Sequence, residues 1–112
     1  MGLKTISPDR LHHVMQDQHT TVIDVNPRHG WTKARVPGAL NLDPHAYRDS
    51  DLPRDKDAAL VFYCSNPMCR KAPTAARRAK KMGYRKVQVM SAGISGWVSA
   101  GLPTEQGESG AR

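Results

Sequence analysis

Residues 58–83 read AALVFYCSNPMCRKAPTAARRAKKMG, and the sharpest change of pattern in the chain lies within them. The first part, 58–64, is apolar and rich in strand-forming residues, which predicts a buried strand. The second part is helical in pattern, because small and apolar residues recur at helical spacing and Gly83 follows as a typical helix end. The segment therefore predicts a strand, a loop region that holds both cysteines of the chain, and a helix. The inner face of that helix is expected to consist of Ala72, Ala75, Ala76, Ala79 and Met82.

Strands and helices alternate on both sides of this segment. A helix is expected to begin at Ser7, because a serine followed by Pro8 and Asp9 is a typical helix start. A short last helix is expected at 93–101. This order predicts an α/β fold with three layers, α/β/α, around a five-stranded, mostly parallel sheet. The four further strands are predicted from apolar or β-branched runs at 3–7, 20–25, 38–42 and 86–90.

The length of the chain, 112 residues, fits one domain. We expect this domain to span residues 4–104, and the polar residues 105–112 to form a flexible C-terminal tail. Lys and Arg number 17 against 10 Asp and Glu, which gives a formal net charge of +7. That charge favours anionic partners, although it says nothing about the fold.

The sequence shows neither an export signal nor a membrane span. Its first ten residues, MGLKTISPDR, lack the apolar core of a secretory signal, and no apolar run reaches the roughly 20 residues that cross a bilayer. We therefore expect a cytoplasmic protein with no membrane partner. In that compartment a pair of cysteines is more often reactive or metal-binding than a structural disulfide.

Cys64 is the candidate catalytic nucleophile. It ends the predicted central strand, and ligands of parallel sheets bind at the carboxyl ends of the strands. The loop after it leads into a helix start, whose free N–H groups, together with Arg70 and Lys71, favour a thiolate anion. The alternative is that Cys64 is a small buried core residue. Substrate contacts are expected from Ser65, Asn66, Met68, Cys69, Arg70 and Lys71.

Cys69 has two interpretations. It is either an incidental loop residue or a candidate resolving thiol, which would attack an oxidised or persulfidated Cys64. A disulfide needs Cα atoms within about 7 Å of each other, and a loop that curls around an anion could bring the two cysteines that close. The sequence leaves both interpretations, and the question of a disulfide, open.

No metal site and no cofactor are expected. The histidines show no spacing around the cysteines that is typical of metal ligands, and we expect them to lie on the surface. They are His12, His13, His19, His29 and His45.

Three segments of the chain resemble, in the right order, the single-domain members of the rhodanese family. The first is VIDVNPRHGWTKARVPGALNL, 22–42, in which Asp24 and the turn Pro37-Gly38-Ala39 match the family. The second, 63–84, is similar to the family's active-site strand, loop and helix. The third is SAGISGWVSAGLP, 91–103, where the matching residues are Gly93, Trp97, Gly101, Leu102 and Pro103.

This resemblance implies a rhodanese-like fold and a sulfurtransferase that needs no cofactor. Cys64 would take a sulfane sulfur from a small anionic donor such as thiosulfate and become a persulfide. A thiophilic acceptor, such as cyanide, another thiol or a protein, would then remove the sulfur. The chain departs from the family where Asn26 replaces the usual Arg and Arg35 the usual His. Its loop also carries Pro67 and Cys69 where Gly and Ser are commonest.

Two other functions are compatible with the same residues. Cys64 and Arg70 have the spacing of cysteine-dependent phosphatases and of some arsenate reductases on this fold, in which Arg70 would hold a tetrahedral oxyanion. Alternatively, the chain is a non-catalytic module that binds a protein or a polyanion through the basic run RRAKK, 77–81. We do not expect a nucleic-acid partner, because no aromatic residues are interleaved with this run to stack on bases.

Overall fold

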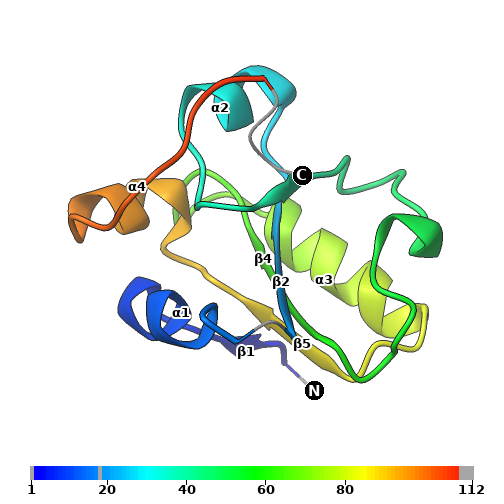
Figure 1. The fold of residues 1–112 in the computed structure, drawn as a ribbon. Coiled ribbons are helices and arrows are strands. Elements are labelled where there is room, and N and C mark those ends of the chain that lie inside the picture. Colours follow the sequence, from blue (N-terminus) through cyan, green and yellow to red (C-terminus); the bar gives the residue numbers. More distant parts are fainter. Residues whose placement is uncertain (1, 18, 109–112) are drawn as a thin grey trace.

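The computed structural model describes residues 2–17 and 19–108, and five strands form a single sheet at its centre (Figure 1). The strand order is β1-β5-β4-β2-β3, and every neighbouring pair is parallel. This confirms the predicted fold class. The strands are β1 (Lys4–Thr5), β2 (Thr20–Asp24), β3 (Leu40–Asn41), β4 (Ala59–Tyr63) and β5 (Lys86–Val89).

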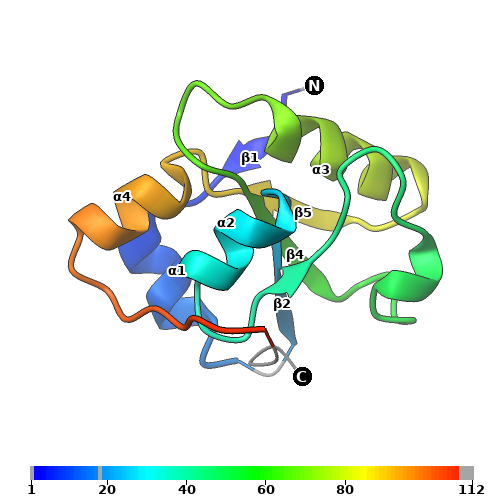
Figure 2. The same cartoon turned by 90° about the horizontal axis from the view of Figure 1, so that it is seen from above.

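Helices cover both faces of this sheet (Figure 2). Helix α3 (Lys71–Lys81) lies on one face, and α1 (Pro8–Val14) and α4 (Gly93–Ser99) lie together on the other. The start of α1 is as predicted, because the side chain of Ser7 accepts a hydrogen bond of 3.1 Å from the N–H of Arg10. The three layers expected from the sequence are therefore present.

Two short elements have no counterpart in the sequence-based expectation. Helix α2 (Arg28–Lys33) follows β2, and a 3-10 turn, η1 (Asp49–Asp51), precedes β4. Helix α2 contains Gly30, a poor helix former, and no side chain caps its start. A helix this short is set by its tertiary contacts, chiefly the burial of Trp31, and these leave little trace in the local sequence.

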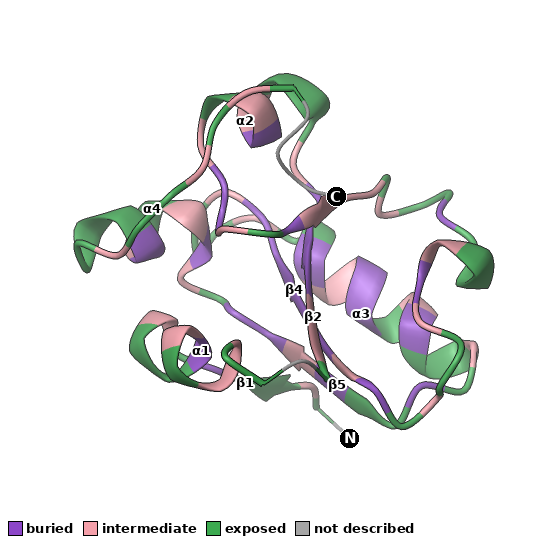
Figure 3. Ribbon diagram, viewed as in Figure 1, coloured by how far each residue is buried: buried purple, intermediate pink, exposed green. Residues whose placement is uncertain are grey.

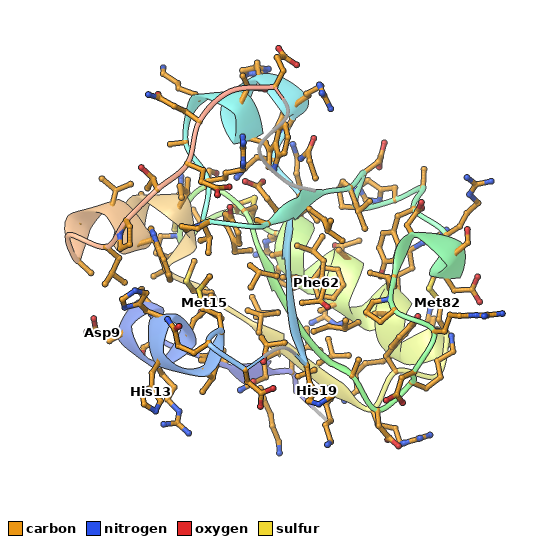
Figure 4. All side chains as sticks on the ribbon, in the orientation of Figure 1. Asp9, His13, Met15, His19, Phe62 and Met82 are labelled. Carbon is orange, nitrogen blue, oxygen red and sulfur yellow. A yellow bond between two sulfur atoms is a disulfide. The ribbon has the colours of Figure 1, made fainter. Side chains whose placement is uncertain are left out.

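The strand residues divide between two cores because successive side chains of a strand point to opposite faces. Ile23, Leu60 and Phe62 pack toward α3, in a core cluster that includes the alanines of that helix. Val22, Val61 and Tyr63 pack in a second cluster on the side of α1 and α4. Figure 3 shows the buried residues along β2, β4 and the inner stripe of α3, and Figure 4 shows Phe62 inside the molecule.

The described part of the C-terminal segment pairs with the domain. Glu105 and Arg35 exchange two backbone hydrogen bonds of 3.0 and 2.9 Å, and the N–H of Gly107 donates to Thr32 at 2.8 Å. The buried guanidinium of Arg35 lies 3.9 Å from the ring centre of Trp31 and donates to the carbonyl of Gly107. Residues 105–108 fall in the segment expected to be a flexible tail, and 109–112 lie outside the described residues. Among the described helices, none is long and apolar enough to cross a membrane.

Candidate active site

Cys64 lies directly after β4, the middle strand of the sheet. Strand β4 is flanked by β5 and β2, so Cys64 emerges at the carboxyl edge, where ligands of parallel sheets bind. Its side chain is only 2% exposed and packs in the same cluster as Phe62 and Ala72. Cys64 therefore lies at the edge where ligands bind, and its side chain is shielded from bulk solvent.

The start of α4 lies beside the loop after Cys64 and is hydrogen-bonded to it (Figure 2). The N–H of Ile94 donates to the carbonyl of Cys64 at 2.9 Å, and the N–H of Ser95 donates to the carbonyl of Ser65 at 3.0 Å. Gly93 directly precedes these two donors and has a φ of +68°, a conformation that favours glycine. The carbonyls of Cys64 and Ser65 therefore both accept hydrogen bonds from α4.

The N–H groups of the same peptide units face the other way. The described peptide bonds are all trans, and a trans unit directs its N–H opposite to its C=O. The N–H groups of Ser65 and Asn66 consequently point away from α4, and no protein acceptor within 2–17 or 19–108 takes their hydrogen bonds. The N–H groups of Arg70 and Lys71, at the start of α3, are likewise free. Together they offer hydrogen-bond donors to an anion.

A tight turn folds the loop back on itself. The side-chain oxygen of Asn66 accepts from the N–H of Met68 at 2.9 Å, and its backbone carbonyl accepts from the N–H of Cys69 at 3.1 Å. This turn brings Cys69 to Cys64, and a disulfide joins the two, with their Cα atoms 6.4 Å apart. The sulfur atoms of the two cysteines thus meet, which the sequence left open.

Exposed residues surround this pair. Arg70 occupies the position before α3 without a capping hydrogen bond from its side chain, Lys71 is the first residue of the helix, and both residues are exposed. Neither forms an ion pair with any residue that the structure describes. Met68 stands at the tip of the loop, 86% exposed. Of the predicted contact residues, Ser65 and Asn66 follow Cys64 in the chain and Cys69 is joined to it by the disulfide. Arg70 and Lys71 are exposed at the start of α3, and Met68 is exposed to solvent.

A cavity of about 370 Å³ opens beside Lys71, the first residue of α3. Lys71 lines it, together with Asn26, Asn41 and His45. Its other walls include Val25 and Leu42, which pack in the same cluster as Cys64 and Cys69. Neither cysteine lines the cavity, and its charged lining residues are Arg28, Lys71 and the carboxylate of Asp43.

A buried polar network lies under the site, and sequence reasoning missed it. The hydroxyl of Tyr63 donates to the carboxylate of Asp24 at 2.7 Å and accepts from the N–H of Val36 at 3.0 Å. Asp24 also accepts from the N–H of Asn26 at 2.7 Å. Burial raises the pKa of Asp24, although the bonds from Tyr63 and Asn26 oppose this. The network ties the end of β2 to the end of β4, directly before Cys64.

The only sequence signal of this network was an acidic residue in an apolar run. Asp24 ends the strand TTVID and is completely buried, which is costly for a carboxylate without partners. Burial, and the negative charge of Asp24, also raise the pKa of Tyr63. The tyrosine therefore stays neutral and acts as a donor to Asp24, so its role is to position the strand end.

Four of the five histidines are exposed, and His12 is half-buried. His13 and His19 are exposed and lie on the outside of the molecule, as Figure 4 shows. Within the described ranges, no group of three or more His, Cys, Asp or Glu side chains could hold a metal ion.

Comparison with known proteins gives one family. A family model described as a rhodanese-like domain matches residues 7–100. The chain is 26% identical over 105 residues to the thiosulfate sulfurtransferase GlpE of Actinobacillus succinogenes, which covers 94% of this chain and 93% of that protein. It is 35% identical over 89 residues to the HTH-type transcriptional regulator Rv0324 of Mycobacterium tuberculosis. That match covers 78% of this chain but only 38% of the regulator.

Solved structures show the same fold. A thiosulfate sulfurtransferase from Pseudomonas aeruginosa matches with a TM-score of 0.83 and 30% identity, over 96% of this chain and 20% of that one. The BH2092 protein from Bacillus halodurans matches with a TM-score of 0.82 and 20% identity, over 92% of this chain and 77% of that one. The second likeness shows the fold alone.

Proposed function

Because this chain belongs to the rhodanese-like domain family, and is related to thiosulfate sulfurtransferases, we propose that it carries a sulfane sulfur as a persulfide on Cys64. The observation that supports this most is the pairing of a shielded cysteine with free N–H groups. Those of Ser65 and Asn66 have no protein acceptor among the described residues, and α3 begins just beyond them. Such donors stabilise an anion, and a persulfide is anionic.

The proposed first half-reaction loads the sulfur. The Cys64 thiolate attacks the outer sulfur of thiosulfate, the sulfur–sulfur bond of thiosulfate breaks, and sulfite leaves with the electron pair. Arg70 and Lys71 attract the dianionic donor, since both are exposed and free of ion pairs. The remaining loop residues, Ser65, Asn66, Met68 and Cys69, complete the contact surface. Cys64 must first be released from its disulfide.

The proposed second half-reaction removes the outer sulfur from the Cys64 persulfide. Cyanide attacks the outer sulfur of the persulfide, thiocyanate forms, and the Cys64 thiolate returns. A thiol or a protein thiolate can act in the same way, and the cavity beside Lys71 offers an approach. No cofactor takes part in either step. We expect these steps to run in the cytoplasm, where thiol reductants keep Cys64 available.

Intact mass spectrometry tests this function. The reduced Cys69→Ser variant, in which Cys64 is the sole thiol, should gain one sulfur atom from thiosulfate, and cyanide should remove it. The Cys64→Ser variant should gain none. If the wild type gains no sulfur but hydrolyses a phosphate ester, and both Cys64 and Arg70 are needed for this, then the protein is a cysteine-dependent phosphatase instead.

A further inference from the structure

We propose that Cys69 is an internal acceptor for the Cys64 persulfide, so that the protein releases sulfide from thiosulfate at the expense of its own two thiols. This inference rests on the proposed function, because it begins from the loaded persulfide. It adds an activity, reductive sulfide release, for which a dithiol reductant is the co-substrate.

The product of sulfur release to Cys69 is a disulfide between Cys64 and Cys69, and the structure shows this disulfide. The disulfide between Cys64 and Cys69 forms with Cα atoms 6.4 Å apart, within the range of ordinary disulfides. The two bonds accepted by Asn66 fix the turn that places Cys69 there. The bonds from α4 to the carbonyls of Cys64 and Ser65 remain in place. Transfer therefore needs no rearrangement of the fold beyond the loop.

The step balances as a thiol–disulfide exchange. The Cys69 thiolate attacks the inner sulfur of the persulfide, the Sγ of Cys64. The bond between the two cysteine sulfurs forms, and the bond to the outer sulfur breaks. The outer sulfur takes up the proton that Cys69 gives up and leaves as hydrosulfide with the electron pair, so it is reduced while the two thiols are oxidised to the disulfide. Together with loading, one thiosulfate and two thiols give one sulfite, one sulfide and one disulfide.

Two properties favour the departure of hydrosulfide, its low basicity and the free N–H groups around it. Exchange is faster when the leaving sulfur is a weaker base, and hydrosulfide is a weaker base than an alkyl thiolate. The free N–H groups of Ser65 and Asn66, and those at the start of α3, stabilise the negative charge that develops on it. The donors that hold the persulfide thus also assist its cleavage.

Burial favours the internal thiol over external ones. The side chain of Cys64 is 2% exposed, so a bulky thiol reaches its inner sulfur poorly, whereas Cys69 lies five residues away in the same loop. A thiol held beside its target acts at an effective concentration far above the millimolar level of free thiols. Cyanide, which is small and attacks the outer sulfur, still competes.

A dithiol completes the cycle. Cys69 is the more accessible of the two sulfurs, with intermediate exposure, so the first thiolate of the reductant attacks its Sγ. Cys64 leaves as a thiolate, which the loop N–H groups stabilise. The second thiol of the reductant then attacks its own sulfur in the mixed disulfide and frees Cys69. The reductant becomes a disulfide, and the protein returns to the dithiol form.

A single-turnover experiment tests the inference. Protein is reduced with dithiothreitol, desalted, and mixed with thiosulfate in the absence of any other thiol or cyanide. Sulfide, free protein thiols and intact mass are followed together. The wild type should release one sulfide per chain, lose both thiols, and return to its original mass less two hydrogen atoms. The Cys69→Ser variant should gain one sulfur atom and hold it, releasing sulfide at least about a hundredfold more slowly.

Other results of this experiment would overturn either the inference or the proposed function. If both proteins gain sulfur and hold it equally long, or both release sulfide at the same rate, Cys69 is not the acceptor and the inference is overturned. A release rate per chain that rises with protein concentration would also overturn it, because the acceptor would be another molecule. If neither protein gains sulfur or releases sulfide, the proposed function itself fails. A Cys69→Ala variant, compared by circular dichroism, guards against a folding defect of the serine variant.

Discussion

Gly93 lies so close to Ser65 that a Cβ atom on the glycine would stand 2.6 Å from the carbonyl carbon of Ser65. The same Cβ would stand 2.6 Å from the backbone nitrogen of Asn66. Real side chains do not approach backbone this closely, so the first residue of α4 can only be a glycine while the loop after Cys64 keeps its course.

We therefore expect Gly93→Ala to impair persulfide formation by displacing the loop. Gly101→Ala is the matched control, because Gly101 has a similar φ of +74° but open space where a Cβ would be. Both variants should lose about 1–2 kcal/mol of stability from the left-handed backbone. Only Gly93→Ala should also slow sulfur uptake from thiosulfate, measured by mass spectrometry with both variants in the Cys69→Ser background. Equal uptake by the two variants would show that the close approach does not shape the site.

Asp24 should make stability depend on pH in a recognisable way. Burial raises the pKa of Asp24 above its ordinary value of 3.8, so the folded protein binds this proton more tightly than the unfolded chain. Its contribution is full below about pH 3.8 and is lost as the pH rises through the folded pKa. Relative to Asp24→Asn, which has no such proton, the wild type should lose free energy of unfolding as the pH rises, by at most about 1.4 kcal/mol per pH unit.

Urea unfolding of the two proteins across this pH range measures the difference. The other carboxylates titrate in both proteins and cancel. A wild type that gains stability over Asp24→Asn with rising pH would mean that the bonds from Tyr63 and Asn26 outweigh burial.

Arg70→Ala should weaken the use of an anionic donor. A charge-assisted hydrogen bond contributes roughly 1.5–3 kcal/mol, so the apparent second-order rate of sulfur uptake from thiosulfate should fall about tenfold or more. Arg70 is exposed, so the free energy of unfolding should hardly change. Lys80→Ala is the control, since it removes an equal charge about 15 Å further along α3. If both variants slow uptake equally, only the overall charge matters.

Cys69→Ser should make Cys64 vulnerable to peroxide. In the wild type, Cys69 traps a sulfenic acid on Cys64 as the disulfide, which thiols can reverse. Without it, the sulfenic acid proceeds to sulfinic acid, and sulfur uptake should be lost irreversibly. The sulfite released from thiosulfate after peroxide and subsequent dithiothreitol treatment measures this. Recovery of the variant to the same extent as the wild type would contradict a protective role.

The central strand, the helix after it and the position of Cys64 could be predicted because their signals are local. A continuous apolar run, a stripe of alanines and a helix start each lie within a few residues. The tie between Tyr63 and Asp24 could not, because it joins residues 39 positions apart and depends on the register of β2 against β4. The pairing of Cys64 with Cys69 depends on the turn at Asn66, and short polar loops adopt several turns with similar sequences.

The unequal exposure of the two cysteines determines how the protein will respond to chemical labelling. Once the disulfide is reduced, a bulky maleimide or a labelled iodoacetamide can reach the half-buried Cys69, whereas Cys64, at 2% exposure, admits only compact reagents. A fluorophore attached through the second cysteine would therefore sit at the mouth of the site without consuming the nucleophile, and could report on occupancy. An inhibitor of this protein would follow the opposite rule: a slim, anionic electrophile suits the buried sulfur of Cys64, whereas a large electrophile would react at Cys69 and leave the nucleophile untouched.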